Sequence, residues 1–176
     1  MNSIIRIIFK RSFLSLYIAQ YLGAFNDNFF RTAMATFVTY GMVTMSSQYK
    51  TVVVSMAVGL FMLPFFLFSA LAGELADKYR KDLIVKATKL IEVIIAVLAI
   101  AGFMLQNIPL LLFVLFLMGT QAAFFGPTKY SILPDILGDD ELIAGNALIE
   151  AGTYASILQG TIVGGLIFTL GMQYVP

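Results

Sequence analysis

Two oppositely charged residues, Asp27 and Arg31, interrupt a stretch that is otherwise mostly apolar and aromatic. Their spacing places them one turn apart on a helix, where they could neutralise each other. Asn26 and Asn28 flank the carboxylate, however, and make a polar cluster larger than an ion pair requires. A charge at the centre of a membrane helix costs roughly 2.5–3.5 kcal/mol. We therefore interpret Asp27, Asn28 and Arg31 as a polar binding site facing a cavity, with a simple ion pair as the alternative.

A second pair of charges lies near the ends of two later apolar segments. Lys129 ends one segment, and Glu150 lies about two helical turns inside the next. On antiparallel helices the two side chains would lie at similar depth and could interact. Lys129 could also simply extend its alkyl chain toward water. Glu150 has small and apolar neighbours, so its carboxylate requires a cation, and we include both residues among the candidate binding residues.

The sequence contains neither histidine nor cysteine. This removes imidazole as a general acid or base and the serine–histidine and cysteine–histidine nucleophile pairs. It also removes disulfides and every thiolate metal site. We therefore expect no enzyme activity, no cofactor, no metal site and no nucleic-acid partner.

The composition is that of a membrane protein. Only 12% of the 176 residues are charged and 60% are hydrophobic, and the mean hydropathy is +0.90. A soluble domain would be about a quarter charged and a little under half apolar. We predict an all-α integral membrane protein, a bundle of about five transmembrane helices. The predicted spans are residues 12–40, 52–71, 83–105, 110–130 and 142–170.

The distribution of basic residues predicts the topology. We treat residues 1–176 as one transmembrane domain with cytoplasmic loops at 72–82 and 131–141. Every Lys and Arg other than Lys50 and Arg31 lies in or beside the N-terminal segment or one of these loops. Because short basic loops remain in the cytoplasm, the N-terminus is predicted to be cytoplasmic.

Three further patterns concern helix packing. Pro64, inside the second span, predicts a kink. Lys89 and Glu92 are three residues apart in the third span, and we interpret them as a local ion pair on one helix face. In the fifth span, small residues recur at every fourth position and predict a surface on which another helix packs closely. These small residues are Gly152, Ser156, Gly160 and Gly164.

The loop after the second span contains Gly73 and Asp77, followed by Arg80 and Lys81. Between two spans, this pattern resembles the loop that joins helices 2 and 3 in the major facilitator superfamily. Three other stretches resemble the bacterial lysophospholipid transporters and the transporter half of their fusions with acyltransferase and acyl-carrier-protein synthetase domains. They are residues 23–28 (GAFNDN), 125–134 (FGPTKYSILP) and 145–153 (GNALIEAGT).

The resemblance implies part of the N-terminal half of a major facilitator fold, in a transporter of the bacterial inner membrane. Such a protein moves lysophospholipid across the membrane by alternating access. The resemblance further implies that Asp27, Lys129 and Glu150 supply the charges of the cavity, and that the loop with Asp77 latches two halves of the transporter. The implied partners are membrane lipids, the lysophospholipid, and either a C-terminal half or a fused or separate acyltransferase.

Two alternatives stay open at this point. The chain could be the membrane domain of a lysophospholipid acyltransferase fusion, although such acyltransferases use a His-Asp motif and the sequence has no histidine. It could also be a non-transporting fragment, because superfamily transporters are built from two six-helix halves and only five spans are predicted here. The fourth span also lacks the arginine of proton-coupled drug antiporters.

Overall fold

The computed structural model describes residues 2–42 and 44–172, and within them the chain forms helices and no strand. The elements are α1 (Asn2–Phe9), α2 (Arg11–Thr36), the π-helix η1 (Phe37–Gly41), α3 (Ser47–Lys78), α4 (Lys81–Met104), α5 (Ile108–Ile136) and α6 (Leu142–Met172). The prediction of an all-α helical bundle is confirmed. The short helix α1 was not predicted as a separate element.

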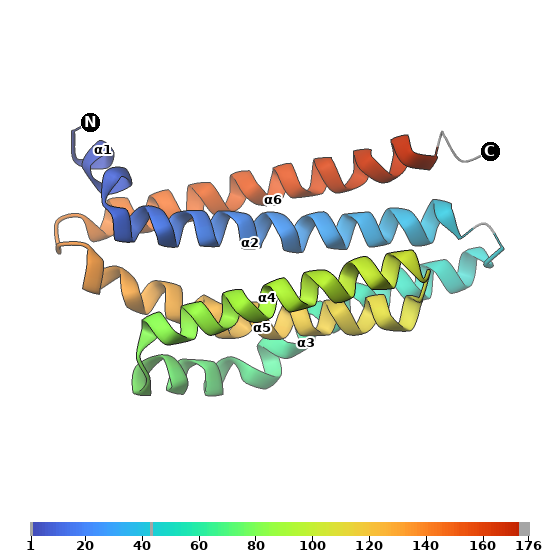
Figure 1. Cartoon of the computed structure of the whole chain (residues 1–176), viewed down its shortest axis with the longest axis horizontal. Coiled ribbons are helices and arrows are strands. Elements are labelled where there is room, and N and C mark those ends of the chain that lie inside the picture. The colour runs from blue at the N-terminus through green and yellow to red at the C-terminus, as the bar shows by residue number, and fades with distance from the viewer. Residues whose placement is uncertain (1, 43, 173–176) are drawn as a thin grey trace.

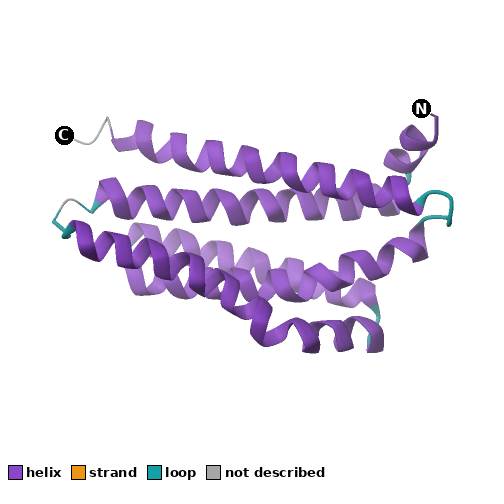
Figure 2. Ribbon diagram, turned by 180° about the vertical axis from the view of Figure 1, so that it is seen from behind, coloured by secondary structure: helices purple, strands orange, loops and turns teal. Residues whose placement is uncertain are grey.

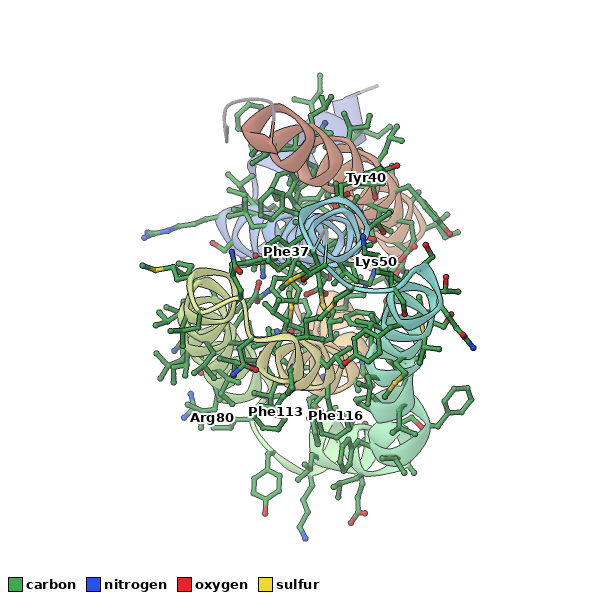
Figure 3. The ribbon with its side chains drawn as sticks, turned by 90° about the vertical axis from the view of Figure 1, so that its right-hand side faces the viewer. Phe37, Tyr40, Lys50, Arg80, Phe113 and Phe116 are labelled. Carbon is green, nitrogen blue, oxygen red and sulfur yellow. The ribbon has the colours of Figure 1, made fainter. Side chains whose placement is uncertain are left out.

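The long helices lie side by side along the long axis of the molecule (Figure 1). Helix α6 packs along α2, and α5 packs against both α3 and α4. Seen from the end, α6 lies outermost, α2 lies beneath it, and the group of α3, α4 and α5 lies beneath α2 (Figure 3). Phe113 and Phe116 lie on the side of α5 that faces away from α2 (Figure 3). Helix α2 is therefore the element that joins the two groups.

Two apolar clusters hold the bundle together, and α2 and α5 contribute to both. One cluster contains Phe30 of α2 and Leu115 of α5, together with buried residues of α3 and α4. The other contains Phe13 of α2 and Leu133 of α5, together with buried residues of α1 and α6. Gln20 and Asp27 of α2 and Gln121 of α5 lie between the residues of the two clusters, whereas Lys129 of α5 lies beside residues of the second cluster.

The helices extend further than the predicted spans. Helix α3 continues to Lys78 and α5 to Ile136, so much of the expected loops 72–82 and 131–141 is helical. The prediction ended each span near the first charged residues. Charges mark where a chain leaves the apolar layer, but a helix can continue into water beyond that point. Pro127 lies inside α5 without ending it, as is tolerated in membrane helices.

Helices α3 and α5 are each long and apolar enough to cross a membrane, judged by length and composition among the described residues. Helices α2 and α4 have 26 and 24 residues and contain charged side chains, which in α4 all lie in the first half of the helix. Helix α3 changes direction part-way along (Figure 2), and Pro64 lies in its interior, as the predicted kink requires.

An ion pair between Lys10 and Glu141 ties the start of α2 to the loop before α6. Glu141 also accepts a hydrogen bond of 3.2 Å from the backbone N–H of Gly138. The hydrogen bond that Glu141 accepts from Lys10, and after it the one from Gly138, lower the pKa of the Glu141 carboxyl below its ordinary value of 4.5. The positive charges of Lys10 and Arg6 act in the same direction.

We therefore expect stability to fall at acidic pH in a way that depends on Glu141. A carboxyl with a depressed folded-state pKa stabilises the fold above its unfolded-state pKa and loses that contribution as the pH falls through the folded-state value. Thermal unfolding in detergent from neutral to acidic pH measures the effect. Glu141→Gln is expected to flatten the profile below about pH 4.5, whereas Asp139→Asn, an exposed acid in the same loop, keeps it. An unchanged profile in Glu141→Gln would contradict the assignment.

Candidate functional site

A pocket of about 190 Å³ lies where α2, α4 and α5 meet, with Phe65 of α3 on its wall. Its polar lining residues are Gln20, Asp27, Lys89, Gln121 and Lys129. They come from three different helices, α2, α4 and α5, so the pocket forms only when these helices pack together. Asp27 and Lys129, two of the residues predicted from the sequence, therefore line the same pocket.

The Asp27 carboxylate makes no ion pair with Arg31 in the described part of the chain. Arg31 instead donates a hydrogen bond of 2.5 Å to Oδ1 of Asn28, and its guanidinium lies 4.9 Å from the centre of the Phe61 ring of α3. Asn28 in turn donates to the backbone oxygen of Ala24. Asn28 and Arg31 are absent from the pocket lining. The predicted cluster is thus divided, with Asp27 at the pocket and Arg31 directed toward α3.

Lys129 is only 8% exposed and lines the pocket from α5. Its ammonium nitrogen lies 4.7 Å from the centre of the Tyr130 ring. Lys129 and Glu150 do not form an ion pair among the described residues. The Glu150 carboxylate accepts a hydrogen bond from the hydroxyl of Tyr130 and is not part of the pocket lining. Among the described residues, the Lys129 ammonium therefore lies at the pocket without a direct salt bridge to a carboxylate.

Lys89 and Glu92 were predicted only as a local ion pair, but they also contact the neighbouring helices α2 and α5. The pair exists, with Nζ and Oε2 separated by 2.7 Å, but it faces α2 and α5. A Cβ placed on Gly23 of α2 would lie 2.7 Å from the Lys89 nitrogen. Gln121 of α5 donates a hydrogen bond of 3.3 Å to the Glu92 carboxylate. The Lys89 nitrogen also lies 4.4 Å from the centre of the Phe125 ring.

A signal for this arrangement was present in the sequence. The buried residues of α4 include Thr88, Ile95 and Ala99. Glu92 falls on the same helical stripe, four residues after Thr88 and three before Ile95, and this spacing places it on the face that packs into the bundle. The spacing alone did not show that a glycine of α2 would make room for Lys89.

The residues predicted as a switch loop are largely helical, because Gly73 and Asp77 lie in the last turns of α3 and Lys81 begins α4. Lys81 forms an ion pair of 2.7 Å with Asp135 of α5 and donates a hydrogen bond of 2.7 Å to the backbone oxygen of Ser131. Arg80 pairs with Asp82 at 3.1 Å. Asp77 is exposed, and a Cβ placed on Gly73 would meet open space. The structure thus connects Lys81 to the end of α5 and leaves Asp77 at the surface.

The four small residues of α6 lie along α2. A Cβ placed on Gly152 would lie 2.6 Å from the Tyr17 ring, and one on Gly164 would lie 2.5 Å from the backbone oxygen of Phe29. Gly160 approaches the backbone of Phe25 in the same way, and Ser156 is fully buried. Polar contacts reinforce this interface at two places. They are Gln20 to Thr153 at 2.8 Å and Tyr21 to Gln159 at 2.6 Å.

The pocket is lined by groups of both charges. It presents one carboxylate and one ammonium without salt-bridge partners among the described residues, and beside them a neutral Lys89–Glu92 pair and two amides. The described residues contain no group of acidic side chains, histidines or cysteines that could hold a metal ion. The arrangement suits recognition of a zwitterion through charge-assisted hydrogen bonds.

Comparison with known proteins identifies the fold family. The family model of the Major Facilitator Superfamily matches residues 12–175, which is nearly the whole chain. The chain belongs to the Major Facilitator Superfamily. This membership makes it a multi-pass membrane protein, and it confirms the resemblance to the superfamily seen in the loop between α3 and α4.

Several curated relatives of the chain are named lysophospholipid transporters. The chain is 31% identical over 160 residues to the lysophospholipid transporter LplT of Salmonella newport and to that of Salmonella enteritidis. It is 28% identical over 162 residues to the lysophospholipid transporter LplT of Cronobacter sakazakii. In each case the match covers 91% of this chain but only 37% of the relative. No solved structure matches the chain significantly.

Proposed function

We propose that this superfamily chain forms part of a transporter that moves lysophospholipid across the bacterial inner membrane by alternating access. The names of its relatives support the substrate class, and the match to 37% of their length supports a role as part of a larger transport unit. The proposal assigns movement of a lipid without covalent chemistry. A C-terminal half, or a fused or separate acyltransferase that uses the delivered lysolipid, would be the partner.

The observation that carries this proposal is that Asp27 and Lys129 line the same pocket. A lysophosphatidylethanolamine headgroup has an anionic phosphate and a cationic amine. In the proposed complex, the Lys129 ammonium binds the phosphate and the Asp27 carboxylate binds the amine. The Lys89–Glu92 pair is internally neutral, so it adds polarity without favouring either charge of the ligand. Glu150 acts at a distance through Tyr130, which is the neighbour of Lys129.

The same proposal places the N-terminus and the α3–α4 junction in the cytoplasm, where their basic residues are favoured. Asp77 is exposed there and has no partner in the described residues, as expected for a residue that contacts another half of the transporter. Lys81 holds the junction onto α5 through Asp135. In this proposal Asp77 makes the latch, Arg80 flanks it, and Lys81 fixes its base.

The proposal is tested by uptake of labelled lysophosphatidylethanolamine into spheroplasts that carry the complete natural protein containing this chain. Asp27→Asn keeps the size of the side chain and removes its charge. Loss of a hydrogen bond to a charged group costs about 1.5–3 kcal/mol, so uptake is expected to fall roughly 10- to 150-fold. Asp139→Asn makes the same chemical change at an exposed loop position and is expected to leave uptake unchanged.

The outcomes separate the substrate from the site. If the unaltered protein moves no lysophospholipid above the background of membranes lacking it, the proposed function is wrong. If it does so and Asp27→Asn retains full uptake at equal membrane abundance, the assignment of the amine to Asp27 is wrong. Lys129→Met, tested in parallel, reports on the phosphate contact by the same criterion.

A further inference from the structure

Helix α1 (Asn2–Phe9) runs across the direction of the long helices instead of along it (Figures 1 and 2). It lies at the end of the bundle where the loop between α5 and α6 turns (Figure 1). If the long helices cross a bilayer, a helix in this position lies near the plane of the membrane surface. The site and its proposed mechanism make no use of α1.

One side of α1 is fixed to the bundle. Ile7 is fully buried and belongs to the apolar cluster that also contains Phe13 and Leu133. The backbone N–H of Lys10 donates to the Ile7 oxygen at 3.1 Å, which closes the turn between α1 and α2. The side chain of Lys10 is held by Glu141. Helix α1 therefore has a defined position and a defined outward face.

The outward face of α1 is apolar. Ile4, Ile5, Ile8 and Phe9 are all exposed, and Phe9 is 79% exposed. At 100° per residue these four side chains fall within one arc of the helix, and Arg6 lies outside that arc. The described residues leave much of these apolar side chains uncovered. They require an apolar environment of another kind.

The charges beside this face indicate which environment it is. Arg6 and Arg11 are exposed and form no ion pair in the described chain. A helix with an apolar face and flanking cations at the end of a membrane bundle matches the boundary between lipid headgroups and acyl chains. Exposed cations at that depth are attracted to anionic lipid.

We propose that α1 is an interfacial helix that lies in the cytoplasmic leaflet, with Ile4, Ile5, Ile8 and Phe9 in the headgroup–acyl boundary and Arg6 and Arg11 at anionic lipid phosphates. Its anchor at Ile7 fixes the first long helix, and with it Asp27, relative to the membrane surface.

The absence of cysteine from the sequence makes the test direct. Single substitutions Ile5→Cys, Ile8→Cys and Arg6→Cys, each in the full chain and each at an exposed position, are labelled with a nitroxide in vesicles of phosphatidylethanolamine and phosphatidylglycerol. Relaxation by oxygen reports exposure to lipid, and relaxation by a water-soluble nickel chelate reports exposure to water. At positions 5 and 8 we expect oxygen to relax the nitroxide more strongly than the nickel chelate does. At position 6 we expect the nickel chelate to have the stronger effect.

Each other outcome counts against the proposal. Equal access of the nickel chelate to all three positions would place α1 in water. Protection of positions 5 and 8 from both reagents would show that protein covers the face, either a second copy or another segment. In vesicles of phosphatidylcholine alone, access of the nickel chelate to position 8 is expected to rise at least twofold. No change there would remove the assignment of Arg6 and Arg11 to anionic lipid.

Discussion

Replacement of Lys89 by methionine is expected to lower the free energy of unfolding by up to about 3–5 kcal/mol, the cost of removing one partner of a fully buried ion pair, because the Lys89–Glu92 pair is partly buried. The side chains of Lys89 and Glu92 are only 24% and 17% exposed, and their charged atoms are 2.7 Å apart. Without Lys89, the Glu92 carboxylate retains the amide of Gln121 at 3.3 Å, which is a neutral donor. Methionine fills a similar volume, so the expected loss comes from the uncompensated charge.

Chemical denaturation in detergent micelles, followed by circular dichroism, measures this effect. Lys86→Met is the matched control, because Lys86 is 75% exposed and pairs with Asp82 at 3.6 Å. An exposed pair of this kind contributes about 0–1 kcal/mol. Neutralising both partners, in Lys89→Met/Glu92→Gln, is expected to recover much of the stability lost in the single variant. If Lys89→Met and Lys86→Met were equally stable, the Lys89–Glu92 pair would be a solvated surface pair.

The sequence predicted the charged positions better than the contacts between them. Asp27 and Arg31 are four residues apart and were compatible with an ion pair. In the structure, Arg31 instead donates a hydrogen bond of 2.5 Å to the side-chain amide oxygen of Asn28, which is three residues away in the sequence. The Arg31 guanidinium also lies over the Phe61 ring of α3. That ring is a tertiary neighbour, and a single sequence does not show which helix it will lie against.

Lys89 makes one contact that the sequence predicted and one that it did not. Its spacing to Glu92 was sufficient to predict their ion pair, because that contact is local to one helix. Its contact with α2 depends on Gly23, a residue that contributes only the absence of a side chain. The fold class and the small-residue packing surface of α6 could be predicted from the sequence. Composition and the spacing of small residues can each be read from one segment at a time. Pockets between helices depend on several segments together.

The second large effect is expected where two helix backbones meet at a glycine. A Cβ placed on Gly119 of α5 would lie 2.2 Å from the backbone oxygen of Phe61 in α3, and one on Gly160 of α6 would lie 2.4 Å from that of Phe25 in α2. Backbone atoms cannot move aside as a flexible side chain can, so the helices must separate. Gly119→Ala and Gly160→Ala are each expected to destabilise the protein by about 1–3 kcal/mol, the usual cost of overpacking.

Gly59 provides the internal control, because it lies inside α3 and a Cβ there would meet nothing within 4 Å. Alanine is favoured over glycine within a helix by about 0.5–1 kcal/mol, so Gly59→Ala is expected to raise stability slightly. Denaturant midpoints measured in one detergent are therefore expected to fall below that of the unaltered protein for Gly119→Ala and Gly160→Ala. The midpoint of Gly59→Ala is expected to rise. Equal stabilisation by all three would mean that helix propensity alone sets the effect and that α2–α6 and α3–α5 do not touch through their backbones. Destabilisation confined to Gly119→Ala and Gly160→Ala would place the close approach at both interfaces, including that between α6 and the helix that carries Asp27.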